Sequence, residues 1–185
     1  MHFRLKPTLH AALLFGALAG GASIQAATMS NDEYKAAKDR IEAEYKDHKA
    51  SCDKLKDNAK DVCQEQAKGK EKVARAELEF NRTGDQKDAA KVAMAKADAA
   101  YDVAKEKCDD LKGNDKDVCV KEAKASHTQA TADAKANKKV SEVRKDAADD
   151  KRDAAYNVAK EKCDGLSGDT KAQCLATAKA RYGKS

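Results

Sequence analysis

The sequence predicts an all-α protein made of three tandem αα-hairpins. Disulfides would staple each hairpin, and the hairpins would form an elongated, Ala-rich antiparallel bundle or array. The first reason is a repeat, because YDVAKEKCDDLKGNDKDVC at 101–119 returns at 156–174 as YNVAKEKCDGLSGDTKAQC. A more divergent copy, YKDHKASCDKLKDNAKDVC, stands at 45–63. Repetition at a period of 55–56 residues indicates one duplicated supersecondary unit.

The second reason is composition. Ala, Lys, Asp and Glu dominate the chain, and Ala, Lys and Glu are good helix formers. The single proline is Pro7, so no proline interrupts a helix beyond the first residues.

The N-terminus has the pattern of a secretory signal peptide at 1–26. Arg4 and Lys6 precede a short apolar run at 11–22, and small residues follow with Ala26 or Ala27 at the expected cleavage point. The apolar run is shorter than the ~20 residues that a membrane-spanning helix needs. We therefore expect a cleaved leader, no membrane-spanning helix in the mature chain, and a periplasmic or secreted location.

The charges argue against nucleic-acid binding, and the core is thin. Without Arg4 and Lys6 the chain has 35 basic and 32 acidic residues, and the two signs alternate throughout. Nucleic-acid-binding proteins instead cluster Lys and Arg on one face. Leu, Ile, Val and Phe total 16 in the expected mature chain of about 159 residues, a level at which disorder becomes a concern. We therefore expect covalent support for the fold.

Each unit is expected to be helix, tight turn, helix, over 30–82, 85–137 and 140–183. In the middle unit one helical stripe recurs at spacings of three and four. Its members are Met94, Ala97, Tyr101, Ala104, Cys108 and Leu111. Gly113 would end this helix in a left-handed conformation, and Asn114 would cap the next one. Gly168 has the same place in the third unit, whereas the first unit has Asp57 there.

The links between units differ. NRTGD at 81–85 predicts a turn, with Gly84 in it and Asp85 as the following cap. NKKVS at 137–141 has no glycine. Two turns would give a six-helix antiparallel bundle, whereas a continuous helix at 137–141 would leave the hairpins strung along a longer helix.

The six cysteines are expected to pair within the hairpins. Each pair is eleven residues apart and roughly equidistant from its turn, which brings the Cα atoms near the 5.5–6 Å of a disulfide. The pairs are Cys52–Cys63, Cys108–Cys119 and Cys163–Cys174. Closing such a loop contributes about 2–3 kcal/mol in the chain-entropy model. In the alternative, each pair lies on one unbroken helix, ~16 Å apart, and bonds to a second helix; the mid-span Gly113 and Gly168 argue against it.

No catalytic motif is present, so we expect no enzyme, no catalytic or cofactor-binding residue and no metal site. His48 lies four residues before Cys52, and with Cys63 it could hold a soft metal such as Zn²⁺. The matching positions, Ala104 and Ala159, carry no such ligand.

Two other functional readings of the repeat residues remain open. Cys63, Cys119 and Cys174 lie early in their helices with Lys nearby, a setting that favours reactive thiols. Tyr45, Tyr101 and Tyr156 stand seven residues before each first cysteine. They are either a row of binding side chains or the bulky ends of a small-residue seam, and the seam is the simpler interpretation.

Three resemblances bear on function. The Ala/Lys/Asp/Glu-rich helical run over 30–182 resembles the central region of TolA, which implies a TolA-like cell-envelope protein. CDDLKGNDKDVC (108–119) is similar to the repeats of PsiF-type exported proteins, which implies a stapled hairpin. AKEK, at 104–107 and 159–162, is similar to motifs of late-embryogenesis-abundant stress proteins.

The expected function is therefore a non-enzymatic, exported structural or interaction module of the bacterial cell envelope. Its partner would be an envelope protein or the membrane surface, with no nucleic acid and no small-molecule substrate. The alternatives are a stress-protective protein and a thiol-based redox or metal-binding protein.

Overall fold

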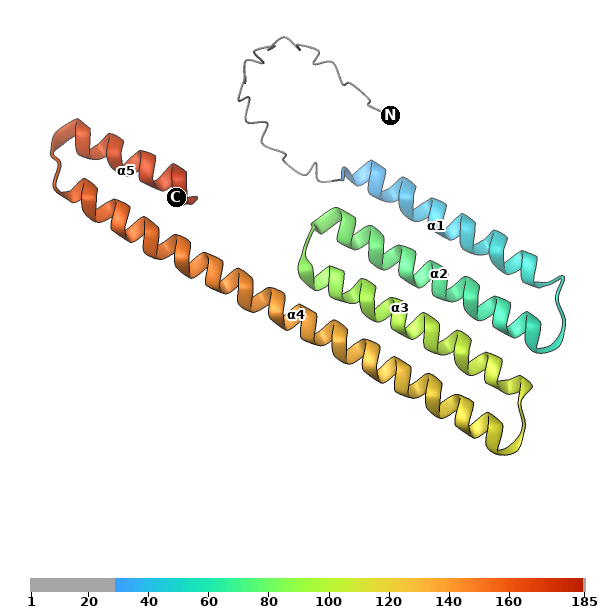
Figure 1. Ribbon diagram of the computed structural model, residues 1–185. Coiled ribbons are helices and arrows are strands. Elements are labelled where there is room, and N and C mark those ends of the chain that lie inside the picture. The colour runs from blue at the N-terminus through green and yellow to red at the C-terminus, as the bar shows by residue number, and fades with distance from the viewer. Residues whose placement is uncertain (1–28, 185) are drawn as a thin grey trace, which may run out of the picture.

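A computed structural model describes residues 29–184 (Figure 1). The expected leader at 1–26 lies outside this range. The described residues contain only helices and their connections. The helices are α1 (Asn31–Cys52), α2 (Asp57–Thr83), α3 (Gln86–Lys107), the 3₁₀ turn η1 (Cys108–Asp110), α4 (Gly113–Asp164) and α5 (Gly168–Tyr182). The predicted all-α class is confirmed.

The helices form an open antiparallel array. The extensive packing is between consecutive helices: α1 with α2, α2 with α3, α3 with α4, and α4 with α5. Figure 1 shows α1, α2, α3 and the first half of α4 lying side by side, while α5 lies beside the far end of α4. The sequence predicts either a bundle or an array, and the structure is an array. Each inner helix keeps two faces that no other described helix covers.

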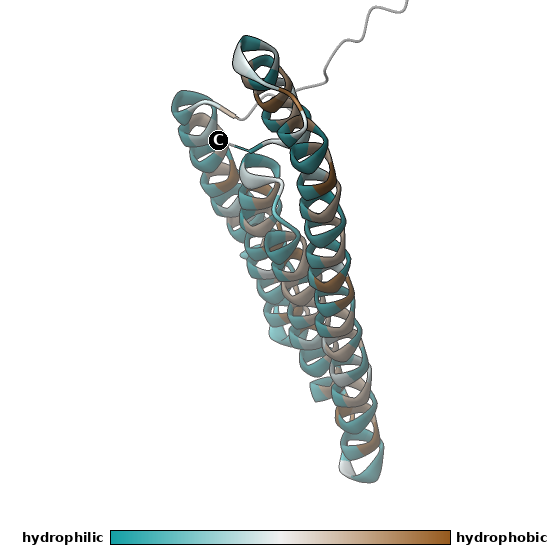
Figure 2. Ribbon diagram, turned by 90° about the vertical axis from the view of Figure 1, so that its left-hand side faces the viewer, coloured by the Kyte–Doolittle hydropathy of each residue, from teal (hydrophilic) through white to brown (hydrophobic). Residues whose placement is uncertain are grey.

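The buried core consists mostly of small side chains. The buried apolar residues are Ile41, Cys52, Ala67, Leu78, Ala90, Ala95, Ala97, Cys108, Ala123, Ala134, Cys163 and Ala178. Figure 2 shows the hydrophobic residues as short stretches within largely hydrophilic helices. Small side chains let helix backbones approach closely, most clearly where Gly69 of α2 meets Ala99 of α3. A Cβ atom built on Gly69 would lie 2.7 Å from the Ala99 Cβ.

The link at 81–85 is a turn, as predicted. Gly84 is left-handed with φ 64°, and its N–H donates to the Phe80 carbonyl. The Asp85 carboxylate caps α3 by accepting from the Lys87 N–H at 2.8 Å. Thr83 Oγ1 donates to Asp88 Oδ2 at 2.6 Å, which ties the end of α2 to the start of α3.

The link at 137–141 is not a turn. It lies inside α4, a single helix of 52 residues. The two units expected at 85–137 and 140–183 therefore share one helix, and no break separates them. Of the two possibilities that the sequence leaves open, the continuous helix is the one found.

The hairpin turns differ in detail from the prediction. Gly113 and Gly168 are left-handed, with φ of 55° and 56°, and Asp57 takes the same conformation at φ 52°. Each begins the second helix instead of ending the first. The expected Asn114 cap is therefore wrong, and α4 has no side-chain cap.

The difference from the predicted turn begins at the end of α3. The chain tightens into η1 from Cys108, so the predicted apolar stripe ends at that cysteine. Leu111 is 41% exposed.

Candidate functional site

Three disulfides fix the hairpin turns. Cys52–Cys63, Cys108–Cys119 and Cys163–Cys174 have Cα–Cα distances of 5.6, 5.7 and 5.7 Å. The first cysteine of each pair is buried. Each disulfide joins two antiparallel helices across one turn, so the geometry with both cysteines on one unbroken helix is wrong.

The two cysteines considered as metal ligands beside His48 have no free thiolate. Cys52 and Cys63 are bonded to each other, and none of the six cysteines is free. The thiols that the redox reading requires at Cys63, Cys119 and Cys174 are likewise held in disulfides.

The repeated tyrosines pack across their hairpins in two of the three units. The Tyr101 ring lies 5.0 Å from the His127 ring, and the Tyr156 ring lies 6.4 Å from that of Tyr182. His127 and Tyr182 hold the same repeat position, nineteen residues after the first cysteine, where the first unit has Glu71. In these two units the tyrosines fill the seam.

A polar cluster joins three helices beside Tyr101. The Asp98 carboxylate of α3 accepts from Lys72 Nζ of α2 at 2.7 Å. Its other oxygen lies 2.7 Å from His127 Nε2 of α4. The hydrogen bonds from Lys72 and then from His127 lower the pKa of Asp98 below its usual value.

The sequence alone did not identify this cluster. Lys72 and Asp98 are 26 residues apart, and their meeting depends on the register of α2 against α3. No local pattern signals that register, so only the packed helices reveal the cluster.

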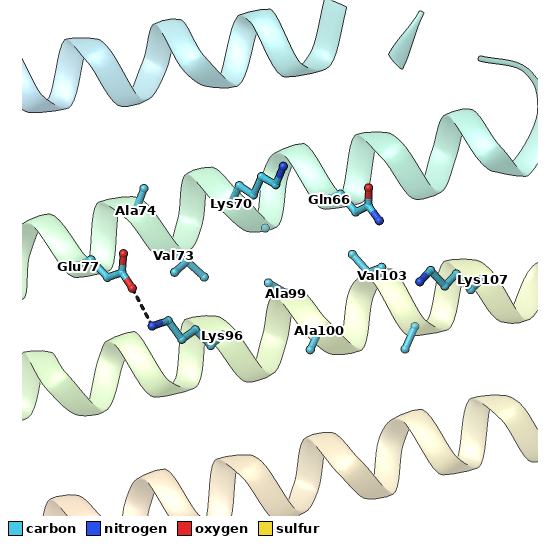
Figure 3. Close-up of a pocket in the computed structure, with 12 residues that line it drawn as sticks. Gln66, Lys70, Val73, Ala74, Glu77, Lys96, Ala99, Ala100, Val103 and Lys107 are labelled. Atoms are coloured by element: carbon cyan, nitrogen blue, oxygen red, sulfur yellow. Dashed lines mark ion pairs between the residues drawn. The ribbon is translucent and has the colours of Figure 1, made fainter. Parts of the chain in front are cut away.

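An apolar groove of about 780 Å³ runs between α2 and α3 (Figure 3). Its apolar lining residues are Gly69, Val73, Ala74, Ala99, Ala100, Val103 and Ala104. Lysine stems and two further polar residues form the rim: Gln66, Lys70, Glu77, Lys96 and Lys107.

The groove and the polar cluster occupy different faces of the array. Asp98 is two residues from both Lys96 and Ala100, about 200° around a helix with 3.6 residues per turn. One face of the α2–α3 layer is therefore an apolar groove edged by lysines, and the other carries the Lys72–Asp98–His127 cluster.

A shorter groove of about 400 Å³ lies between α4 and α5. Ala155, Val158, Ala159 and Lys162 line it, at the repeat positions of Ala100, Val103, Ala104 and Lys107. The first helix of a unit thus contributes the same positions to both grooves, although one groove lies between two units and the other within the third hairpin.

Fold and surface together define an open array of disulfide-stapled helical hairpins. No described helix has the length and apolar character needed to cross a bilayer. No family model, curated protein or solved structure matches this chain.

Proposed function

We propose that this protein is a non-enzymatic structural or interaction module of the bacterial cell envelope, of the TolA-like kind, and that it is exported to the periplasm. The observation that carries the proposal is the open array. Helices α2 and α3 each pack between two neighbours and still leave both broad faces of the layer uncovered. An enzyme of this size would usually enclose its chemistry in a concave site, whereas this layer offers extended surface.

Two further observations support the proposal. Three disulfides are compatible with an oxidising compartment, because thiols in the cytosol are kept reduced. The 52-residue α4 is about 78 Å long at 1.5 Å per residue, which suits a spacer that holds two hairpins apart.

Fractionation and thermal unfolding test this proposal. The protein should occur in the periplasmic fraction, and its intact mass should show loss of residues 1–26. Far-UV circular dichroism should show a cooperative melt that collapses when the disulfides are reduced. A cytosolic protein with the full mass, or one with reduced cysteines, would contradict the proposal.

Envelope integrity provides the functional readout. A strain that lacks the protein should become more sensitive to detergent, and the wild-type chain should restore resistance. A variant in which Ala replaces all six cysteines should not restore it, since the hairpins would lose their staples. Full rescue by that variant would argue against a module that acts through its folded array.

The thin core favours one second candidate, a stress-protective protein. Among the described residues only Ile41 and Leu78 are large aliphatic side chains in the core. A protector would lose its helicity gradually on heating, with no cooperative transition, and would reduce aggregation of other proteins. The same melting curve therefore distinguishes the two candidates.

A further inference from the structure

We infer that two copies of this chain form an antiparallel dimer through the outer face of the long helix α4. This inference goes beyond the proposed envelope role and does not depend on it.

Helix α4 is covered on one side only. Its buried residues are Ala123 and Ala134, in the half that packs on α3, and Cys163, in the half that packs on α5. These three positions lie within about 40° of one another on a helix with 3.6 residues per turn. Figure 1 accordingly shows α3 and α5 on the same side of α4, one towards each end. The opposite face runs the length of α4, and no other described helix covers it.

Four exposed valines lie on this outer face. Val118, Val140, Val143 and Val158 are 45–57% exposed. Exposed alanines stand between them: Ala125, Ala132, Ala136, Ala147 and Ala154. These nine residues, the α4 stripe, lie within about 80° around the helix and roughly opposite the buried side. The other large apolar side chains exposed in the described part of the chain are the leucines of the three hairpin turns. An exposed apolar band with polar borders marks an interaction surface.

The charges along one border of the α4 stripe change sign at its centre. Acids lie in the first half and bases in the second: Asp115, Glu122 and Asp133, then Arg144, Lys151 and Lys162. All of them are exposed, and none forms an ion pair with another described residue. This border is therefore acidic at one end and basic at the other.

The opposite border has the reverse order. Its exposed charges are mostly basic and then acidic: Lys121, Lys135 and Lys139, then Asp146, Asp153 and Asp164, with Asp117 as the exception. When two identical helices pack antiparallel, each border faces its own copy running the other way. On both borders the acids of one copy would then meet the bases of the other, which is the complementarity that favours association.

The order of these residues selects a second copy as the occupant. Asp115 and Lys162 are equidistant from the point between residues 138 and 139, and so are Asp133 and Arg144. Val118 and Val158 are equidistant from residue 138. A two-fold axis at this point superposes the charges and the valines together, as an isologous dimer requires. A membrane surface or an unrelated protein would not require both patterns to share one centre.

A parallel pair of α4 helices fits less well. In register, it would set Glu122 against Glu122 and Asp150 against Asp150 within the stripe, where like charges oppose association. In the antiparallel pair Glu122 faces the turn around Ala154, and Asp150 faces the turn around Ala125. The polar residues of the stripe are therefore tolerated in only one of the two directions.

The contact is large enough for a specific dimer. From Val118 to Val158 the stripe runs about 60 Å at 1.5 Å per residue. A strip about 10 Å wide, close to the diameter of a helix, has an area of about 600 Å² on each copy. The total of about 1,200 Å² is at the lower end of specific interfaces. We therefore expect a reversible dimer at micromolar concentrations.

Sedimentation velocity of the full exported chain, checked by intact mass, tests the inference. We expect a dimer that dissociates on dilution. V140E/V143E should raise the dimer Kd at least tenfold, because these valines lie near the two-fold axis, where the new carboxylates of both copies would meet. Glu is a better helix former than Val, so α4 should stay intact.

The matched control is L55E/L166E. It adds the same charge and also removes two exposed apolar side chains, but from hairpin turns outside the stripe. Its dimer Kd should equal that of the wild type. Circular dichroism confirms that each variant is folded.

Two further variants test the antiparallel direction. E122K/D133K makes the centre of one border wholly basic, and R144E/K151E makes it wholly acidic. Each variant alone should be monomeric where the wild type is dimeric, and an equal mixture should form a heterodimer. In a parallel pair this border would face the unchanged one, so mixing would give no more dimer than either variant alone.

Three results would overturn the inference. They are a wild-type chain that stays monomeric at high micromolar concentration, V140E/V143E dimers as stable as those of the control, and no heterodimer on mixing the charge variants. None of these results would alter the fractionation and melting results that test the envelope role.

Discussion

The two links between repeats lead to different architectures. At 81–85, NRTGD turns the chain back, so that α3 packs along α2. At 137–141, NKKVS continues as helix, and the third unit's first helix extends away from the array within α4. One difference is local, because Gly84 accepts the left-handed conformation that ends α2 and the second link has no glycine.

The other difference lies in the surface that would pack after the turn. Counted back from the first cysteine of each unit, the buried Ala90, Ala95 and Ala97 of α3 correspond to Lys145, Asp150 and Arg152 of α4. Charged side chains at these positions could not be buried against a neighbouring helix without a large desolvation cost. In α4 they lie on the surface, where Asp149 pairs with Lys145 and Arg152. A returning helix thus needs both a turn residue and a small-residue seam.

Loss of the last disulfide should have the largest effect. Helix α5 has only 15 residues, and among the described helices its extensive packing is with α4, whereas α3 is held by both α2 and α4. C163A/C174A should destabilise the α5 hairpin by about 3 kcal/mol and release α5, since isolated helices of this length are marginal in water. Hydrogen exchange should show lost protection in 168–182.

The matched variant C108A/C119A should leave α3 protected, because α2 still packs on it. Equal loss of protection in α3 and α5 would show that the neighbouring helix contributes little.

The seam between α2 and α3 can be tested at its closest point. Gly69→Ala adds a Cβ 2.7 Å from that of Ala99, so the helices must move apart. We expect a net loss of about 1–2 kcal/mol, because the overpacking exceeds the roughly 1 kcal/mol gained in helix propensity. Urea unfolding measures it.

Two controls sharpen this test. The double variant G69A/A99G should recover most of the lost stability, since it returns the missing space. Ala125→Gly, at the equivalent and exposed position of α4, should cost only the propensity difference. A stabilising Gly69→Ala would contradict the close seam.

Transplanting the turn tests whether it suffices by itself. Replacing NKKVSE at 137–142 by NRTGDQ should weaken α4 locally by about 1 kcal/mol for the glycine. It should not fold residues 143–164 back, because the seam positions remain charged. Distances between spin labels at 120 and 160 should therefore stay broad and long. Adding Lys145→Ala, Asp150→Ala and Arg152→Ala should shorten them, and a short distance with the turn alone would show that the seam is unnecessary.

The smallest effect should come from Asp98, which joins α2 and α3 to the first half of α4. Its pKa is lowered in the folded state, so its contribution is complete above the unfolded value of about 3.9 and is lost as the pH falls through the folded value. The side chain is partly exposed, and we expect less than about 1 kcal/mol. The stability difference between wild type and Asp98→Asn in urea should be full at pH 7 and should shrink as the pH falls below about 4. A difference that does not change with pH would rule out the carboxylate as its cause.

Local chemistry made part of this structure predictable. The spacing of the cysteines about each turn determined the pairs, and Gly84 with Asp85 determined the first link. The stripe through Ala97 and Tyr101 could be read as far as Cys108, because helical periodicity persists as long as the helix does. The prediction of an Asn114 cap was wrong because the chain tightens into a 3₁₀ turn at η1, and no residue pattern predicts that tightening.

By itself, the sequence determined the helical class, the three staples and the one link between units that contains a glycine, since each depends on residues close together in the chain. Only the tertiary structure decided that the hairpins lie in an open layer, that 137–141 is continuous, and which faces of α2 and α3 are left uncovered. The groove, and the meeting of Lys72, Asp98 and His127, depend on the register between helices. That register is fixed by how small side chains such as Gly69 and Ala99 pack across a seam, and local sequence does not encode it.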